Sequence, residues 1–145
     1  MTKRNLSIFI VLLSLFIFNS LVTAQVSETE AKKTVETLFT LCKKNDFRNS
    51  ANLLAYYGFD NSRVYKDFFN PNNPDELKEI KRICKKINAT LLISDSYSFG
   101  KFRDRIIGGK KFKSLDVIFL SGKQKVKEKI LFITINGKPA IYNYN

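Results

Sequence analysis

The spacing of apolar residues along the chain changes from a helical period to a period of two near residue 91. Before this point apolar residues recur every three or four positions, which is typical of helices that bury one side. After it they alternate with polar residues, which is typical of half-buried strands. The pattern predicts an α+β fold in which N-terminal helices pack on a curved four-stranded antiparallel sheet with a cone-like shape.

Two helices joined by a tight corner are predicted at the start of the folded chain. Ser27 and Glu30 have the spacing of a capping box, so the first helix is expected to begin there, and its apolar stripe extends to Cys42. Asp46 is expected to cap a second helix that continues to Tyr57, where a glycine ends it.

A third helix is predicted after a loop over residues 59–74 that contains one helical turn around residues 64–69. The helix starts at Pro74, which suits a first turn, and its apolar residues continue to Ile87. Lysines and arginines occupy its opposite side. Such a helix either covers a core with a solvated outer face or lies on a membrane, and the lack of aromatic residues on its apolar side favours the core.

Four strands follow the helices: Leu91–Ile107, Phe112–Leu120, Lys125–Ile135 and Ala140–Tyr144. Glycine-containing turns separate them, and Asn136-Gly137 is a strong hairpin signal, so the last three strands are predicted to form an antiparallel meander. The apolar register slips by one at Gly100, which predicts a β-bulge that bends the sheet. The last strand could pair with a second copy in a homodimer, or its lysine and asparagine residues could protect that edge.

The first 24 residues have the composition of a secretory signal peptide. A positively charged start precedes the apolar residues 8–18, and Val22 and Ala24 occupy the −3 and −1 positions of a cleavage site. The apolar segment of 11 residues is too short to span a hydrocarbon layer of ~30 Å. We therefore expect cleavage after Ala24, a secreted or periplasmic protein without a transmembrane anchor, and a single domain over residues 25–145.

The chain carries 25 lysine and arginine residues against 13 acidic residues, a net charge of +12 that becomes +10 when Lys3 and Arg4 leave with the signal peptide. An exported protein does not normally meet genomic DNA, so nucleic acid is not an expected partner. Six side chains are predicted to form one solvent-facing side of the sheet, the basic face: Lys101, Arg103, Arg105, Lys125, Lys127 and Lys129. This basic face either contacts an anionic envelope component, such as lipid or polysaccharide, or meets only water.

Cys42 and Cys84 both belong to the exported part of the chain. Two cysteines in an oxidising compartment are expected to form one disulfide, and the alternative is two buried thiols that act as small hydrophobic side chains. The sequence does not decide between them, because it does not show whether the two Cα atoms come within bridging distance.

The chain contains no histidine. Histidine is the commonest general base and the usual orienter of a serine or cysteine nucleophile, so the chain lacks the usual group for both roles. Metal sites built on imidazole are excluded for the same reason. An enzyme would have to use carboxylates, for which Asp60, Asp67 and Asp104 are the candidates as bases of raised pKa. Scattered aspartates are more often structural, so we expect a protein that is not an enzyme and needs no cofactor or metal.

Seven aromatic residues between the second helix and the first strand are predicted to line a ligand pocket: Tyr56, Tyr57, Tyr65, Phe68, Phe69, Tyr97 and Phe99. Ligand pockets are mostly apolar with a few polar groups, and tyrosine supplies both. The alternative is that these rings fill an ordinary core. A pocket of this kind predicts an exported non-catalytic module that binds a small ligand or a partner. The alternative functions are binding of an anionic envelope component and carboxylate catalysis.

The order of elements resembles the nuclear transport factor 2-like superfamily, part of the wider cystatin-like α+β group. The resemblance covers residues 28–142 and rests on the opening helix "ETEAKKTVETLFTLCKKNDF" and the closing hairpin "KILFITINGKPAIYNY". It implies a sheet wrapped around the helices, with a pocket at the wide end of the cone in which many members bind ligands or partners. The Asp/His pair of the catalytic members is missing, and Glu128 replaces the glycine of the cystatin Q-x-V-x-G hairpin. The resemblance therefore implies neither catalysis nor protease inhibition.

Overall fold

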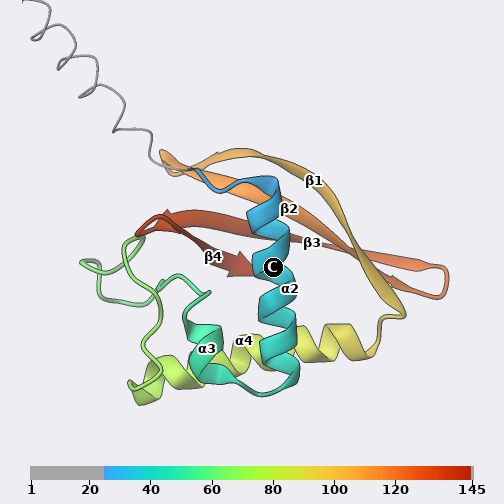
Figure 1. Cartoon of the computed structure of the whole chain (residues 1–145), viewed down its shortest axis with the longest axis horizontal. Coiled ribbons are helices and arrows are strands. Elements are labelled where there is room, and N and C mark those ends of the chain that lie inside the picture. The colour runs from blue at the N-terminus through green and yellow to red at the C-terminus, as the bar shows by residue number, and fades with distance from the viewer. Residues whose placement is uncertain (1–24, 145) are drawn as a thin grey trace, which may run out of the picture.

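The computed structural model describes residues 25–144 of the chain (Figure 1). The predicted signal peptide, residues 1–24, lies outside the described residues, as does residue 145. Three helices precede four strands: α2 (Glu28–Lys43), α3 (Phe47–Ala51), α4 (Pro74–Leu92), β1 (Ser96–Ile107), β2 (Lys110–Ser121), β3 (Gln124–Ile135) and β4 (Lys138–Tyr144).

The four strands form one antiparallel sheet in the order β1-β2-β3-β4, and the helices cover one side of it (Figure 1). The predicted α+β fold, with helices packed on a curved antiparallel sheet, is confirmed. Two of the three hairpins turn through two consecutive residues of positive φ, namely Gly108 (55°) with Gly109 (75°) and Asn136 (50°) with Gly137 (74°). This is the backbone of a type I′ turn, which glycine and asparagine tolerate.

Strand β1 contains the β-bulge predicted at Gly100. Its pairing with β2 shifts in register between Phe99 and Phe102, so that Gly100 and Lys101 together face Asp116. A side chain at position 100 would crowd the neighbouring strand, because its Cβ would lie 3.1 Å from the Asp116 Cβ. The glycine therefore permits a close approach of β1 to β2 at the point where the strand bends.

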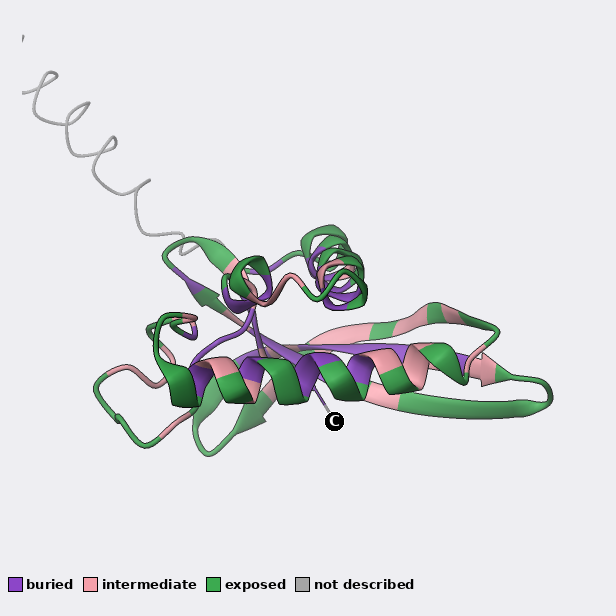
Figure 2. Cartoon of the chain, turned by 90° about the horizontal axis from the view of Figure 1, so that it is seen from below, coloured by how far each residue is buried: buried purple, intermediate pink, exposed green. Residues whose placement is uncertain are grey.

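The core lies between the inner side of the sheet and the apolar stripes of α2 and α4 (Figure 2). The largest fully buried side chains come from all of these elements: Leu38, Ile80, Ile87, Leu115, Phe119, Ile130, Phe132 and Ile141. The apolar side of α4 thus covers the core, which is the first of the two alternatives that its sequence allowed. No helix within residues 25–144 is long and apolar enough to cross a membrane.

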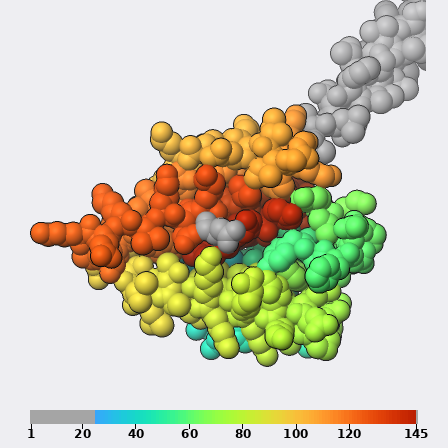
Figure 3. All heavy atoms as spheres, turned by 180° about the vertical axis from the view of Figure 1, so that it is seen from behind, coloured from blue at the N-terminus to red at the C-terminus, as the bar shows by residue number. Residues whose placement is uncertain are grey.

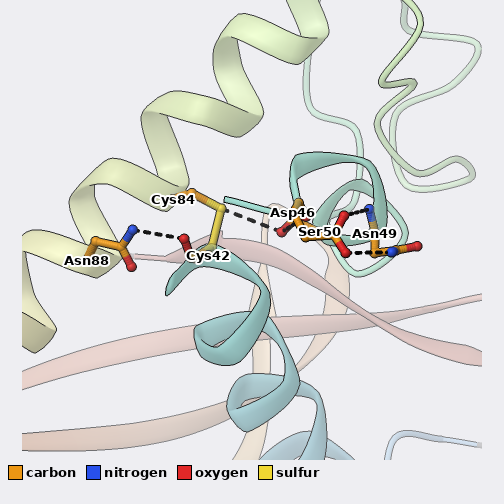
Figure 4. The surroundings of a disulfide bond; sticks show 6 residues. All are labelled: Cys42, Asp46, Asn49, Ser50, Cys84 and Asn88. Atoms are coloured by element: carbon orange, nitrogen blue, oxygen red, sulfur yellow. Dashed lines mark hydrogen bonds between the residues drawn. A yellow bond between two sulfur atoms is a disulfide. The ribbon is translucent and has the colours of Figure 1, made fainter. Parts of the chain in front are cut away.

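Helix α2 begins at the predicted capping box and ends at a disulfide. The Ser27 hydroxyl accepts a hydrogen bond from the Glu30 N–H at 3.3 Å, and the Glu30 carboxylate accepts one from the Ser27 N–H at 2.9 Å. At the other end Cys42 forms a disulfide with Cys84 in α4, with 4.8 Å between their Cα atoms (Figure 4). Of the two alternatives for the cysteines, the structure contains the disulfide.

The disulfide lies in a buried junction of all three helices (Figure 4). The Asn88 side chain of α4 donates a hydrogen bond to the Cys42 carbonyl at 2.9 Å, and the Ser50 hydroxyl of α3 lies 3.6 Å from the Cys84 sulfur. The Ser50 hydroxyl in turn donates to the Asp46 carbonyl at 2.7 Å. The covalent bond therefore fixes α2 and α4 next to the corner that carries α3.

The second helix is shorter than predicted. It ends at Ala51 instead of continuing to Tyr57, because the following residues pair with the outer edge of β4. The Ala55 N–H donates to the Ile141 carbonyl and the Ile141 N–H donates to the Leu53 carbonyl, both at 2.8 Å. This pairing covers part of the strand edge that the sequence left open for a homodimer.

The loop after this segment and the start of β1 also differ from the prediction. The predicted turn at 64–69 lies earlier, over residues 60–67, since Phe68 pairs with Ala55. Leu91 belongs to α4 and not to the first strand, which begins at Ser96. Short apolar runs are ambiguous between helix and strand, and here the helix continues to Leu92 at the spacing of its earlier turns.

Candidate ligand-binding groove

The structure divides the seven aromatic residues of the predicted pocket among three places. Tyr56, Tyr57 and Phe69 line one groove on the surface. Tyr65 and Phe68 lie at the outer side of the sheet, and Tyr97 and Phe99 lie on β1 against the helices. The groove gathers three of these rings around one open volume, whereas Tyr65 alone among the seven lines a second hollow, of about 470 Å³, near the β3–β4 turn.

The groove has a volume of about 460 Å³ and runs between the loop after α3 and the first turns of α4. Figure 3 shows these two segments side by side, with the loop in green and the start of α4 in yellow-green. Its lining combines aromatic and acidic residues: Tyr56, Tyr57, Gly58, Phe59, Phe69, Asp75, Glu76 and Glu79. A volume of this size is within the range of about 300–1,000 Å³ that is typical of ligand sites.

The rings at the base of the groove hold one another in place. Phe69 meets Tyr56 and Tyr57 edge to face, with ring centroids 5.6 and 5.1 Å apart. The Arg63 guanidinium lies over the Tyr56 ring at 4.1 Å from its centroid. Gly58 is needed beside them, because a Cβ there would lie 2.4 Å from the Tyr56 hydroxyl oxygen. The aromatic floor is therefore rigid, and edge-to-face contacts of this kind stabilise it further.

Phe59 is different from these rings because it is fully exposed, at 105% of its reference area. Single exposed apolar side chains are common on protein surfaces, so Phe59 bears on binding only because it lines the same groove as the partly exposed Tyr57. Sequence reasoning missed Phe59, because it stands in a loop without periodicity and nothing in the sequence distinguishes it from a core aromatic residue.

Two of the three groove carboxylates already have cationic partners. Glu76 is buried and accepts hydrogen bonds from Arg63 at 2.7 and 3.2 Å and from the Asn70 N–H at 2.6 Å. Glu79 accepts hydrogen bonds from Arg82 at 2.8 and 2.5 Å and from the Tyr57 hydroxyl. These two glutamates therefore build the wall of the groove.

The ion pair of Glu79 changes the acidity of two groups in the wall. The hydrogen bonds from Arg82 hold the pKa of Glu79 below its ordinary value. Burial, together with the hydrogen bond to Glu79, raises the pKa of Tyr57 well above its ordinary value. The Tyr57 hydroxyl is thus a neutral donor over the whole physiological pH range.

Asp75 is the acidic residue of the groove whose carboxylate remains available. It is exposed in the first turn of α4, and among residues 25–144 no donor or cation reaches its carboxylate. Its backbone N–H donates to the Asn73 side chain at 3.0 Å, which caps the helix and fixes the position of residue 75. The groove therefore combines an aromatic floor with one unpaired negative charge at its rim.

The remaining four aromatic residues have packing partners of their own. Tyr65 stacks on Tyr142 at a centroid distance of 5.0 Å, and Phe68 packs against a small cluster around Ala55. Tyr97 meets Phe39 of α2 edge to face at 5.2 Å, and Phe99 in turn lies 5.8 Å from Tyr97. Phe68, Tyr97 and Phe99 therefore correspond to the alternative of ordinary packing, whereas Tyr65 is packed on one side and lines the second hollow with the other.

The candidate aspartates for catalysis have structural contacts instead. The Asp60 carboxylate accepts hydrogen bonds from the Ser62 hydroxyl and N–H at 2.6 and 3.0 Å, and these bonds lower its pKa where a base would need a raised one. Asp67 pairs with Arg63 at 3.1 Å. The Asp104 side chain is 80% exposed and pairs with Lys113 at 2.7 Å. Within residues 25–144 no group of three or more acidic or cysteine side chains could hold a metal ion.

The basic face is only partly solvent-exposed. Four of its members are exposed lysines: Lys101, Lys125, Lys127 and Lys129. Arg103 and Arg105 are half-buried, and Arg103 pairs at 2.5 Å with Asp116, a carboxylate that is only 3% exposed. The two arginines lie on the same side of the sheet as Asp116 and Lys129, but they are half-buried, and the buried Asp116 on β2 draws Arg103 toward the sheet.

No protein-family model, no curated protein and no solved structure matches this chain. The assignment of function therefore depends on the geometry of the groove and of the charged surfaces.

Proposed function

We propose that this protein is an exported, non-catalytic binding module whose groove accepts an apolar or aromatic group that carries a positive charge. The ligand is a small molecule or the side chain of a partner. The observation that carries the proposal is the combination, in one open groove of about 460 Å³, of a fixed aromatic floor, an exposed Phe59 and the unpaired carboxylate of Asp75.

The aromatic floor supports an apolar or aromatic ligand. Tyr57 is 37% exposed and Phe59 fully exposed, so both rings present surface that a ligand would remove from water. Burial of such surface is favourable at roughly 25 cal/mol per Å². Because Phe69 and Arg63 already fix the inner rings, little conformational entropy is lost when a ligand binds there.

The charges of the groove support a cation. Glu76 and Glu79 are compensated by Arg63 and Arg82, which leaves Asp75 as the uncompensated charge. Aromatic faces attract cations as well, by about 0.5–1 kcal/mol at exposed sites. An acidic and aromatic groove in an exported protein with a net charge of +10 is a local exception to the prevailing sign, so it selects ligands that the rest of the surface repels.

A pair of probes with the same ring and chain length tests this proposal: 4-phenylbutylamine, a cation, and 4-phenylbutyrate, an anion. We expect saturable shifts of the backbone amide signals around Tyr57 and Glu79 in NMR titrations, with the amine bound about threefold to tenfold more tightly. Asp75→Asn should abolish the preference for the amine, and Phe59→Ala should weaken both probes. Leu92→Ala, which removes an exposed apolar side chain far from the groove, is the matched control. Equal affinity of the two probes, or shifts outside the groove, would contradict the proposal.

The order of the helices and strands supports membership of the nuclear transport factor 2-like group, which we also propose. The groove is then a variant of the ligand site expected for that group, opened at the surface beside α4.

A second candidate function is contact with an anionic envelope polysaccharide through the basic face. It is favoured by the row of exposed lysines on β3, Lys125, Lys127 and Lys129, which alternate along one side of the strand. Binding of this kind weakens strongly with ionic strength. The double variant Lys125→Glu/Lys129→Glu tests it, since neither lysine pairs with an acidic residue among residues 25–144, whereas charge reversal at Arg103 would disturb the pair with Asp116.

A further inference from the structure

The turn between β1 and β2 exposes two adjacent isoleucines at the end of the sheet. Ile106 is 72% exposed and Ile107 is 50% exposed. The glycines that follow them have open space around their Cα atoms, with no heavy atom within 4 Å of where a Cβ would be. The tip of this hairpin therefore leaves its most apolar residues uncovered, at the end of the sheet where the described chain begins (Figure 1).

The tip is apolar on both of its sides. Across the two strands Ile106 pairs with Lys111 and Ile107 with Lys110. Cross-strand partners share a side of the sheet, whereas successive residues point to opposite sides. Each side of the tip thus carries one isoleucine next to one lysine. A protein partner would contact one side of the hairpin, whereas a lipid layer would contact both sides. An isoleucine on each side therefore suits lipid better than a protein partner.

The charge around the tip is positive. Residues 104–113 contain four basic side chains and one acidic side chain, a net charge of +3, and the Asp104 carboxylate is already paired with Lys113. Lys110 and Lys111 are exposed, and long lysine side chains can keep their charge in water while their stems follow an apolar group into a nonpolar layer. The arrangement of apolar tip and cationic collar is complementary to an anionic lipid surface.

The chain enters the fold at this same end. Gln25, the first described residue, lines a hollow of about 470 Å³ together with Lys111 and the β3–β4 turn at Gly137. The first residue expected in the exported form therefore lies at the same end of the molecule as the hairpin tip.

We propose that the β1–β2 hairpin tip inserts Ile106 and Ile107 into the interfacial layer of a bilayer that contains anionic phospholipid. This inference goes beyond the proposed function, because the tip and the groove share no residues. The membrane holds the protein by its sheet end, and the groove beside α4 stays open to the aqueous side.

A second exposed apolar pair serves as a contrast. Leu92 and Ile93, at the end of α4, are 85% and 72% exposed. They are followed by Ser94 and Asp95, and the Asp95 carboxylate accepts a hydrogen bond from the Gly122 N–H at 2.7 Å. An acidic residue next to this pair disfavours an anionic surface. Both pairs are exposed and apolar, but Asp95 follows Ile93 closely where Lys110 and Lys111 follow Ile107, and a single lysine, Lys43, lies beside Leu92.

The test uses the exported form that is expected to start at Gln25, which contains every residue of the core, the sheet and the disulfide. Its flotation with vesicles of phosphatidylglycerol and phosphatidylcholine is compared with flotation with phosphatidylcholine alone. We expect binding only to the anionic vesicles, and about a tenfold or greater loss for Ile106→Asn/Ile107→Asn. Leu92→Asn/Ile93→Asn should bind like the wild type. Circular dichroism of each variant verifies that the fold is retained.

A fluorescence measurement locates the inserted residue. Because the sequence contains no tryptophan, Ile107→Trp introduces a single reporter and Leu92→Trp its control. We expect a blue shift of the emission on anionic vesicles for Ile107→Trp and none for Leu92→Trp. Failure of the wild type to bind anionic vesicles, equal losses for the two apolar double variants, or a shift at position 92 alone would overturn the proposal. So would loss of binding in Lys125→Glu/Lys129→Glu with full binding in the isoleucine variant, because the contact would then belong to the basic face.

Discussion

Arg103 on β1 donates a hydrogen bond from Nη2 to Asp116 Oδ2 on β2, at 2.5 Å, across the strand pair that the bulge at Gly100 brings close together. Asp116 is only 3% exposed, although it lies on the side of the sheet that the helices do not cover. Lys127 of β3 is a second, more distant cation at 3.8 Å from the same oxygen. One buried carboxylate thus holds Arg103 of β1 against the sheet and lies near a second, more exposed cation from β3.

Replacement of Asp116 should therefore destabilise the protein more than replacement of an exposed aspartate. Asp116→Ala leaves Arg103 without its partner, and we expect the free energy of unfolding to fall by about 1–3 kcal/mol in urea titrations. Asp104→Ala, which breaks the exposed pair with Lys113, is the matched control and should cost about 1 kcal/mol or less. Equal losses for the two variants would contradict the structural role of Asp116.

The disulfide should contribute a large part of the stability. It closes a loop with a sequence separation of 42 residues, for which the chain-entropy model gives about 4 kcal/mol. We expect reduction, or Cys42→Ala/Cys84→Ala, to lower the midpoint of urea unfolding by a corresponding amount. A mass increase on alkylation that requires prior reduction would verify the bond, and alkylation of the unfolded chain without reductant would contradict it.

Two phenylalanines of the groove should separate binding from stability. Phe59→Ala removes a fully exposed ring and should change the free energy of unfolding by about 0.5 kcal/mol or less. Phe69→Ala removes a ring that is 4% exposed and should cost about 3–5 kcal/mol. Both should weaken 4-phenylbutylamine binding. A strongly destabilising Phe59→Ala would mean that this ring packs against the protein and is not available to a ligand.

Alkaline pH should destabilise the protein through Tyr142. Burial, aided by the hydrogen bond that its hydroxyl donates to the Tyr65 oxygen at 3.2 Å, raises the pKa of Tyr142 to about 12 from an ordinary value of 10.0. The neutral form is favoured in the folded state, so its contribution is complete below pH 10 and is lost as the pH rises from there to about 12. Urea unfolding at several pH values measures this slope, and Tyr142→Phe should make it shallower. A slope unchanged in that variant would assign the effect to other tyrosines.

Local signals in the sequence were sufficient for much of the fold. The capping box at Ser27, the hairpin at Asn136-Gly137 and the bulge at Gly100 each depend on neighbouring residues, so their patterns could be interpreted correctly. The helical period of α4 likewise indicated which side faces the core.

Contacts between distant segments could not be predicted in this way. Nothing in the sequence near Leu54 indicates that it will pair with Ile141, 87 positions later. This pairing replaces the helix that the local pattern predicted there. Asp116 stands in an apolar run, and only the fold shows that Arg103 reaches it. The groove combines Phe59 from a loop with Asp75 from a helix start, so its composition depends on the packing of the loop against α4.

The pairing of residues 53–55 with β4 also limits how copies of the protein can associate. Among residues 25–144 it leaves β1 as the strand of the sheet whose outer backbone groups have no strand beside them. Growth of a filament by strand addition requires an acceptor edge at both ends of every copy. Because residues 53–55 cover part of the β4 edge, two molecules joined through β1 would offer only the shortened remainder of that edge, so strand addition beyond a pair is disfavoured.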